Sequence, residues 1–315
     1  MSFRQVMEIA ELLDSAYVSG EKVAEFLRRH GATDILVKTM QGERGSTDFI
    51  RLRIRGSKSG AAPTLGVIGR LGGIGARSSR IGLVSDADGA IVALATALKA
   101  LTMQLQGDQL PGDLIVSTHI CPQAPTIPHE PVPFMGAPVD MVTMNQEEVS
   151  SEMDAILSVD TTKGNRVLNR KGVAITPTVK EGYILPVCND LLQLLEITSG
   201  QLASVLPLST FDITPYGNGL DHINSILQPA TATDAPVVGV AITAEVAVPG
   251  CATGASHLPD LDVATRFCLE AAKAFGAGQM EFYDRQQFAH AVARYGRLKQ
   301  LQTMGNEPGH RSNES

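Results

Sequence analysis

The sequence predicts an α/β protein of three layers, in which helices cover both faces of a mostly parallel, mixed sheet. Strand-like and helix-like segments alternate along nearly the whole chain, which is typical of such folds. The runs 64–69 (TLGVIG) and 236–242 (PVVGVAI) are continuously apolar, as strands are when both of their faces are covered. In sheets of this kind ligands bind at the carboxyl ends of the strands, so we expect the functional residues there.

Each element is predicted from its own pattern. The apolar residues of the first seventeen positions form an amphipathic pattern, and Ser19 is expected to cap the helix that follows it. Helices are predicted at residues 19–30, 87–105, 189–199 and 261–275, with a short one through Asp221 and Ile226 after the glycine-rich turn 217–219. Further strands are predicted at residues 34–38, 49–55, 114–118, 155–160 and 206–211.

Length and composition limit the domain organisation. A chain of 315 residues with 43% hydrophobic residues can bury one large core without help from disulfides or a metal. We therefore expect one domain over residues 1–300 and a disordered tail over 301–315, because the last residues lack apolar anchors.

Charge and cysteine usage exclude several classes of protein. The cysteines at positions 121, 188, 251 and 268 are far apart and show no CxxC pairing, so neither a zinc knuckle nor a disulfide framework is expected. No signal-like segment opens the chain, and no apolar run approaches the roughly 20 residues that span a bilayer. A net charge of -7 with scattered basic residues offers no broad basic face. The sequence thus favours a cytoplasmic protein that binds neither membranes nor nucleic acid.

Polar residues gather at the predicted strand ends. They are Arg70, Asp86, Asp88, His119, Asp160, Asp221, His222 and Glu245. Carboxylates and imidazoles of this number are enough to hold one or two divalent ions. Their spacing is not a compact metal motif such as HExxH, so the pattern by itself favours metal binding and structural roles equally.

Several of these residues also have structural interpretations. Asp86 and Asp88 precede a helix and could cap it or complement its dipole. His119 could be a buried histidine that binds a backbone carbonyl. Asp160 comes before Thr161 and could close its strand with an Asx-turn.

Two further patterns have alternative functional interpretations. The glycine-rich stretch 70–82 could cradle phosphates, but it is not GxGxxG and carries no GK[ST]. Cys121 lies near His119 and His129 and could serve as a nucleophile, although a structural role is favoured because no known Cys/His signature is present.

Seven motifs follow one another in a fixed order. They are GEKVAEFLRRHG (20–31), TLGVIGRLGGIG (64–75), SDADGAIVALATALKAL (85–101), LIVSTH (114–119), ILSVDTT (156–162), GNGLDHI (217–223) and APVVGVAI (235–242). This succession resembles the co-catalytic zinc aminopeptidases and carboxypeptidases of the phosphorylase/hydrolase-like fold, over most of the chain. The segments RLGGIGAR, VSDADGA, THICPQAPT and SVDTTKGNR are similar to a bacterial and archaeal family that carries only a domain-of-unknown-function label. The resemblance implies a zinc-exopeptidase-like fold.

The resemblance also implies roles for single residues. Asp86 matches the aspartate that bridges two zinc ions, and Asp160 matches an aspartate that holds one of them. Arg70 stands where the first histidine ligand is expected, and a guanidinium cannot coordinate a cation. His119 stands where the family has a catalytic glutamate, and the late histidine ligand has no match closer than His257.

Taken together, these patterns predict a hydrolase that cleaves an amide bond of a small, amino-acid-like substrate with a divalent metal, zinc being the expected ion, as one or two ions. The predicted metal ligands are Asp86, Asp160, His119, His222 and His257. His119 is also the predicted general base. The predicted substrate-binding residues are Arg70, Arg77, Arg80 and Asp221.

Other functions stay open at this level. A non-catalytic protein that kept the fold and binds a small carboxylate ligand is the main alternative, because several expected ligands are absent. A metal-free lyase or isomerase has no distinguishing feature in the sequence. The chain has no obvious inserted lid or oligomerisation domain, which is consistent with a small substrate or an unusual oligomer. A small-molecule substrate and a homo-oligomer are the expected partners.

Overall fold

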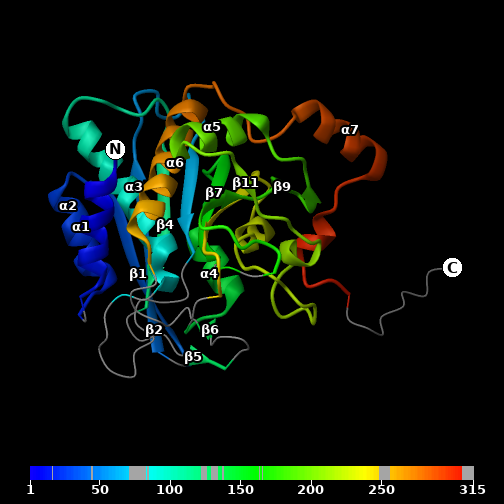
Figure 1. Cartoon of the computed structure of the whole chain (residues 1–315), viewed down its shortest axis with the longest axis horizontal. Coiled ribbons are helices and arrows are strands. Elements are labelled where there is room, and N and C mark those ends of the chain that lie inside the picture. Colours follow the sequence, from blue (N-terminus) through cyan, green and yellow to red (C-terminus); the bar gives the residue numbers. More distant parts are fainter. Residues whose placement is uncertain are drawn as a thin grey trace.

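The structure is a computed structural model, shown in Figure 1, that describes most residues of the chain. These are residues 1–15, 17–43, 45–70, 83, 85–121, 126–128, 134–136, 138–162, 164, 166–247 and 256–306.

A ten-stranded sheet forms the centre of the molecule, with its main path in the order β1-β2-β4-β3-β7-β12-β8-β11. Its strands are β1 (Asp34–Gly42), β2 (Gly45–Ile54), β3 (Leu65–Gly69), β4 (Leu114–Ile120), β7 (Ala155–Thr162), β8 (Gly172–Ile175), β9 (Val179–Lys180), β10 (Tyr183–Ile184), β11 (Ser204–Val205) and β12 (Val237–Thr243). The four inner strands β4, β3, β7 and β12 are parallel, while β2 and β8 join them antiparallel on either side. A separate pair, β5 (Thr126–Ile127) and β6 (Phe134–Met135), follows β4. The sheet is therefore mixed with a parallel centre, as predicted.

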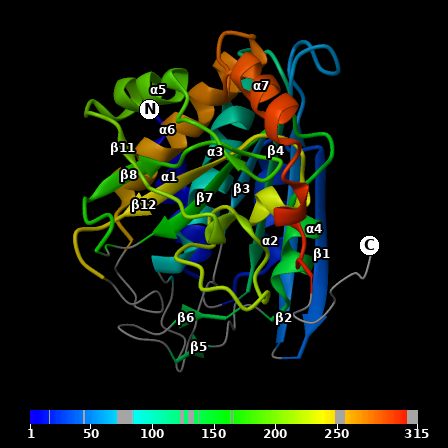
Figure 2. The same ribbon diagram turned by 90° about the vertical axis from the view of Figure 1, so that its right-hand side faces the viewer.

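Helices lie on both sides of this sheet (Figures 1 and 2). They are α1 (Phe3–Leu13), α2 (Gly20–Arg29), α3 (Asp88–Leu105), α4 (Met141–Glu148), α5 (Asn189–Ser199), α6 (Leu258–Gly276) and α7 (Arg285–Tyr295). Short 3-10 turns are η1 (Ser85–Ala87), η2 (Phe211–Ile213), η3 (Gln228–Ala232) and η4 (Lys299–Gln302). One face is covered by α1, α3, α5 and α6, and the other by α4 with η2 and η3. These three layers confirm the predicted α/β class.

Alternation along the inner strands creates two separate cores. Val67, Val116 and Leu157 point to the face of α3 and α6, whereas Ile68, Ile115 and Ile156 point to the opposite face. Successive side chains of a strand leave the sheet on opposite sides, so a residue two positions further along points to the same face again. This parity decides which strand-end residues can meet.

Most predicted elements are present, and two are wrong. Ser19 caps α2 by accepting a hydrogen bond from the backbone N–H of Lys22, and the helix predicted at 189–199 has those bounds in the structure. Residues 206–211 form no strand, because Leu206 packs its side chain into the second core after the short β11 has ended. No helix runs through Asp221 and Ile226, where the chain forms bends and turns before η3.

The close approach of α3 to the strand ends depends on a glycine. A Cβ atom on Gly89 would lie 2.3 Å from the carbonyl oxygen of Arg70 and 2.5 Å from that of Val159. Only a residue without a side chain lets the first turn of α3 lie directly on the ends of β3 and β7. The SDADG motif therefore brings Asp86 and Asp88 to the carboxyl edge of the sheet.

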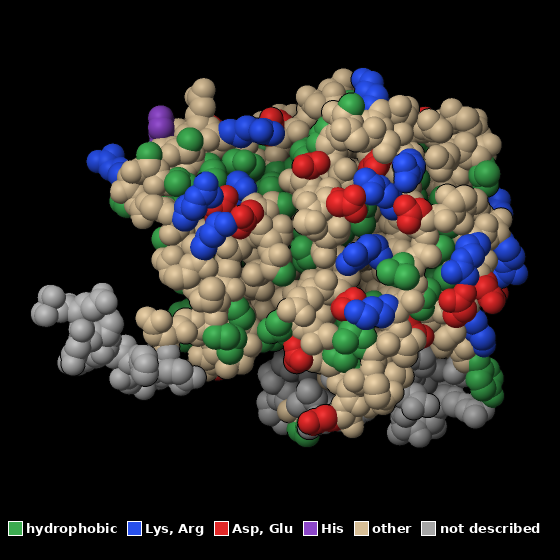
Figure 3. All heavy atoms as spheres, turned by 180° about the vertical axis from the view of Figure 1, so that it is seen from behind, with side chains coloured by type: hydrophobic (Ala, Val, Ile, Leu, Met, Phe, Trp, Pro, Cys, Tyr) green, Lys and Arg blue, Asp and Glu red, His purple; other side chains and the backbone are tan. Residues whose placement is uncertain are grey.

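By length and composition, α3 is the one described helix apolar enough to cross a membrane, but 78% of its apolar window is buried. It lies between the sheet and the helices α1 and α6, which is the position of a core helix. On the face of the molecule shown in Figure 3, basic and acidic side chains are interspersed.

The C-terminal part of the described chain packs back onto the molecule. Gln302 in η4 donates hydrogen bonds to the carbonyl oxygens of Ala230 and Thr233, at 2.7 and 2.8 Å. The tail is predicted over residues 301–315; its first residues, 301–306, are described, and residues 307–315 lie outside the described residues.

Candidate active site

Arg70, His119 and Asp160 lie at the carboxyl ends of β3, β4 and β7, three neighbouring strands of the sheet. Each is separated by an even number of residues from Ile68, Ile115 or Ile156, which form the second core. The three polar side chains consequently leave the sheet on the same face, the one that α4 covers. All three are buried. Parallel pairing thus brings together Arg70, His119 and Asp160, which are 41 to 90 positions apart in the sequence.

Helix α4 places a carboxylate against this group. Asp140 caps the helix by accepting a hydrogen bond from the backbone N–H of Thr143 at 2.8 Å. At the other end the Arg51 side chain donates to the carbonyl oxygen of Glu147 at 2.6 Å. The helix is therefore held at both ends, and its last residue, Glu148, lies fully buried below it.

Glu148 joins Arg70 and His119 into one buried ion cluster. The Arg70 Nη1 atom lies 2.6 Å from Glu148 Oε2, and His119 Nδ1 lies 2.6 Å from Glu148 Oε1. Arg70 also donates to Asn145 Oδ1 at 3.1 Å and contacts the sulfur of Met141. Both carboxylate oxygens and both terminal nitrogens of the guanidinium thus have partners inside the protein, as buried charges require.

The charge state of Glu148 determines which ring nitrogen of His119 carries the proton. Burial alone raises the pKa of Glu148, but the Arg70 charge and the His119 hydrogen bond outweigh it and hold this pKa below its ordinary value. An ionised carboxylate can only accept, so His119 Nδ1 donates and carries a proton. In the neutral ring Nε2 then presents its lone pair, and no described residue binds this buried atom.

Asp160 belongs to a second network beside the cluster. Its carboxylate accepts hydrogen bonds from the Ser225 hydroxyl at 2.8 Å and from the backbone N–H of Thr161 at 2.7 Å. Burial raises the pKa of Asp160 to about 6, against the opposing effects of the Arg70 charge and of the Ser225 hydrogen bond. Tyr216 shares a hydrogen bond with Ser225, and its pKa is raised by burial and by the Asp160 charge.

The raised pKa of Asp160 makes stability depend on pH. Since the carboxyl pKa is about 6 in the native protein and about 3.9 in an unfolded chain, the native state keeps a proton that the unfolded chain has lost. Raising the pH from about 3 to about 7 should therefore cost about 3 kcal/mol at this residue, from 1.36 kcal/mol for each unit of pKa difference. Asp160→Asn should remove this loss.

Urea unfolding of both proteins between pH 5 and pH 8 measures the last part of this loss, about 1.4 kcal/mol for the one unit of pKa difference above pH 5. Because the pKa of Glu148 is lowered, its contribution to stability changes only at pH values below the ordinary pKa of a glutamate, which lie outside that window. Asp234→Asn serves as the control, because Asp234 is exposed and pairs with Lys299 at the surface. Parallel pH profiles of wild type and Asp160→Asn would contradict the assignment.

Three other predicted site residues lie outside the cluster of Arg70, His119 and Glu148, although His222 contacts Tyr216 of the neighbouring network. His222 is held within its own loop by the carbonyl oxygens of Leu220 and Thr214, and it stacks edge-on against Tyr216. Asp221 is exposed in the same loop. His257 lies at the start of α6, within hydrogen-bond distance of Asp260.

The remaining predicted residues lie near the helix start or outside the description. Asp86 is part of η1, and Asp88, the first residue of α3, accepts a hydrogen bond from Ser256. Neither is the N-cap, which is Ala87, although Asp88 is placed to complement the helix dipole. Arg77 and Arg80, predicted to bind substrate, lie outside the described residues, as does the whole glycine-rich stretch from 71 to 82.

The described residues do not by themselves fit a divalent metal. No group of three or more His, Cys, Asp or Glu side chains in the described ranges could hold an ion. The buried guanidinium of Arg70 lies among the available carboxylates and supplies the positive charge that they need. The metal site stays a prediction, since His129, Glu130 and Cys251, which could supply further ligands, lie outside these ranges.

Sequence reasoning missed three residues of the site: Glu148, Tyr216 and Ser225. None follows a predicted strand, and Glu148 ends a short helix in a polar segment, MNQEEVS. The one signal in the sequence is Arg70 itself, because a guanidinium that becomes buried requires a carboxylate partner somewhere in the fold.

Solved structures share this architecture. The bottromycin maturation enzyme BotP in complex with Mn is 12% identical, with a TM-score of 0.52 over 85% of this chain and 71% of that one. The leucine aminopeptidase LAP1 of Caenorhabditis elegans is 13% identical, with a TM-score of 0.51 over 86% of this chain and 65% of that one, so the chain spans just under two thirds of its length. The LapA aminopeptidase of Legionella pneumophila is 11% identical, with a TM-score of 0.50 over 89% and 71%.

These similarities and the layered sheet define a protein with the exopeptidase-like fold that the sequence predicted. The chain belongs to the family described as "Protein of unknown function (DUF1177)", whose model matches residues 38–305. No curated protein matches the sequence.

Proposed function

We propose that this protein is a hydrolase that cleaves an amide bond of a small, amino-acid-like substrate, with His119 as its general base. The observation that carries the proposal is the pair formed by His119 and Glu148: Nδ1 is bound to the carboxylate at 2.6 Å, and Nε2 has no described partner. A nucleophile's base that is itself oriented by a third group is the common arrangement in acyl transfer.

The chemistry follows from this arrangement. Nε2 of His119 would take a proton from the water that attacks the amide carbonyl, and would return it to the leaving amine. Glu148 would stabilise the imidazolium between these two steps, as the buried carboxylate of a hydrolytic triad does. Arg70 compensates the charge of Glu148, so the carboxylate stays ionised and its orientation is fixed.

The contacts of Arg70 support a different role from the substrate binding that the sequence suggested. Its guanidinium is bound to Glu148, Asn145 and Met141. A substrate carboxylate could replace Glu148 only by leaving that carboxylate buried and unpaired, which is costly. We therefore propose that Arg70 positions Glu148 and does not bind substrate.

A divalent ion remains part of the proposal, with zinc expected first. It is supported by the fold shared with aminopeptidases and by the manganese that the description of BotP names. Because the described residues alone do not fit an ion, Asp86 or Asp160 would have to combine with donors from outside the described ranges. We also keep the cytoplasm as its location and a homo-oligomer as its state.

Two measurements on the purified, tag-free protein test the proposal. A panel of N-acyl amino acids and dipeptides should reveal release of a free amine. Elemental analysis with and without chelator should find zinc or manganese in stoichiometric amount, and Asp86→Ala should lose it. No turnover in the presence of added zinc or manganese would reject the hydrolase. It would favour the non-catalytic alternative, a protein that binds a small carboxylate.

A further inference from the structure

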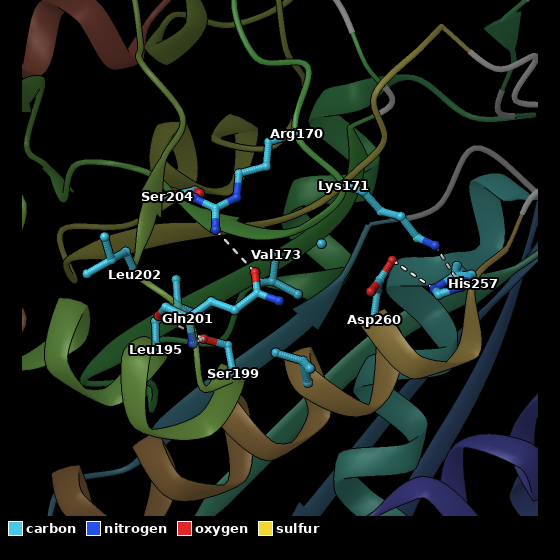
Figure 4. Close-up of a pocket in the computed structure, with 12 residues that line it drawn as sticks. Arg170, Lys171, Val173, Leu195, Ser199, Gln201, Leu202, Ser204, His257 and Asp260 are labelled. Carbon is cyan, nitrogen blue, oxygen red and sulfur yellow. Dashed lines mark hydrogen bonds and ion pairs between the residues drawn. The ribbon is translucent and has the colours of Figure 1, made fainter.

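A cavity of about 370 Å³ lies between the start of β8, the end of α5 and the start of α6, as Figure 4 shows. It shares no residue with the cluster around Glu148. Its size is in the range of small-molecule sites, which combine apolar walls with a few polar groups. The nature of its lining indicates what it could bind.

Two cations at consecutive positions line this cavity, Arg170 beside Gln201 and Lys171 beside His257 (Figure 4). Arg170 donates to the amide oxygen of Gln201 at 3.2 Å, and Lys171 Nζ lies 2.8 Å from His257 Nε2. Neither cation forms an ion pair with a carboxylate of the described chain. Two positive charges at one cavity, neither of them paired with a carboxylate of the described residues, attract an anion.

The one carboxylate in the lining is already engaged. Asp260 Oδ2 lies 3.0 Å from His257 Nδ1, so the ring donates its Nδ1 proton there and offers the Nε2 lone pair to Lys171. In this chain of contacts, Asp260 orients the imidazole and the imidazole orients the ammonium. Lys171 is therefore oriented by its hydrogen bond to His257 and not by an ion pair with a described carboxylate.

The remaining wall is apolar. It consists of Val173, Leu195, Leu202 and Val263. Leu195 belongs to the buried core, whereas Leu202 is 79% exposed. An exposed leucine beside a cavity gains free energy when a ligand's hydrocarbon chain covers it.

From these contacts we infer that the cavity binds a small amphipathic carboxylate. The carboxylate lies between Arg170 and Lys171, which can bind its two oxygens. The branched or linear hydrocarbon part lies against Leu202 and Val173. The inference goes beyond the proposed hydrolase, since it concerns a second site built from other residues.

Calorimetric titration of the full-length protein with isocaproate tests the inference. This probe carries a carboxylate and a branched chain and contains no amide bond that the proposed hydrolase could cleave. We expect saturable binding to wild type and at least about tenfold weaker binding, or about 1.4 kcal/mol, to the Arg170→Gln, Lys171→Gln double variant. Lys58→Gln, which removes an exposed lysine far from the cavity lining, should bind as wild type does.

Two further probes separate the parts of the site. Isohexyl alcohol, which keeps the chain and lacks the charge, and acetate, which keeps the charge and lacks the chain, should both bind more weakly than isocaproate. Absence of binding, equal binding of the alcohol, or an unchanged affinity of the double variant would overturn the inference. Tighter binding of inorganic phosphate than of isocaproate would do the same.

Discussion

Replacing Glu148 by alanine is expected to lower the free energy of unfolding by about 3–5 kcal/mol, because it leaves the charge of Arg70 buried and unpaired. Arg70 is only 3% exposed, and Glu148 is its sole carboxylate partner among the described residues. His119 loses its hydrogen-bond acceptor in the same substitution. Urea unfolding at pH 7 measures the loss.

The neighbouring residue provides a matched control. Glu147 is partly exposed and pairs with Lys38 at the surface, so Glu147→Ala should cost less than about 1 kcal/mol. The double variant Arg70→Met, Glu148→Leu removes both charges together and should be more stable than Glu148→Ala alone. Equal losses in the two single variants would mean that the buried ion cluster does not hold this part of the protein together.

Replacing His119 by glutamine should reduce the turnover of a cleaved substrate by about 10²–10⁴-fold, the usual contribution of a general base. Glutamine can still donate a hydrogen bond to Glu148, so the cluster should keep its structure while the basic nitrogen is lost. Because the substituted group acts on the proton in the transition state, kcat should fall and KM should change little.

Steady-state kinetics with the best substrate of the amide panel checks this expectation, and circular dichroism checks that the variant is folded. His290→Gln is the control, since His290 is exposed on α7. A His119→Gln protein that retains wild-type turnover would exclude His119 as the base, even if the hydrolase activity itself is real.

Most of the correct predictions from the sequence came from the apolar patterns of the strands. Continuous apolar runs located β3 and β12, and the rule that ligands bind at strand ends selected Arg70, His119 and Asp160, which the structure places on one face. The strand predictions succeed because burial on both faces leaves a clear apolar pattern. The departure of Arg70 from the family pattern was visible as well, since a guanidinium cannot be a ligand.

Site residues that come from irregular segments could not be predicted from the sequence. Glu148 is 78 positions from Arg70 in the sequence, and only tertiary packing brings them to 2.6 Å. His222 was grouped with the strand ends because it follows a glycine-rich turn, but the loop satisfies its ring from within. Leu206 looked like a strand residue because a buried loop position can be as apolar as a strand position.

The central claim is that Glu148 holds His119 with its Nε2 lone pair, which has no partner among the described residues, at the carboxyl edge of the sheet. Nitrogen-15 NMR of the histidine side chains tests it most directly, with the His119→Gln variant used to assign the ring. The account predicts that neutral His119 carries its proton on Nδ1 and that Nε2 is the unprotonated nitrogen. A neutral ring protonated on Nε2 would contradict the claim, because the base would then face Glu148 and not a substrate.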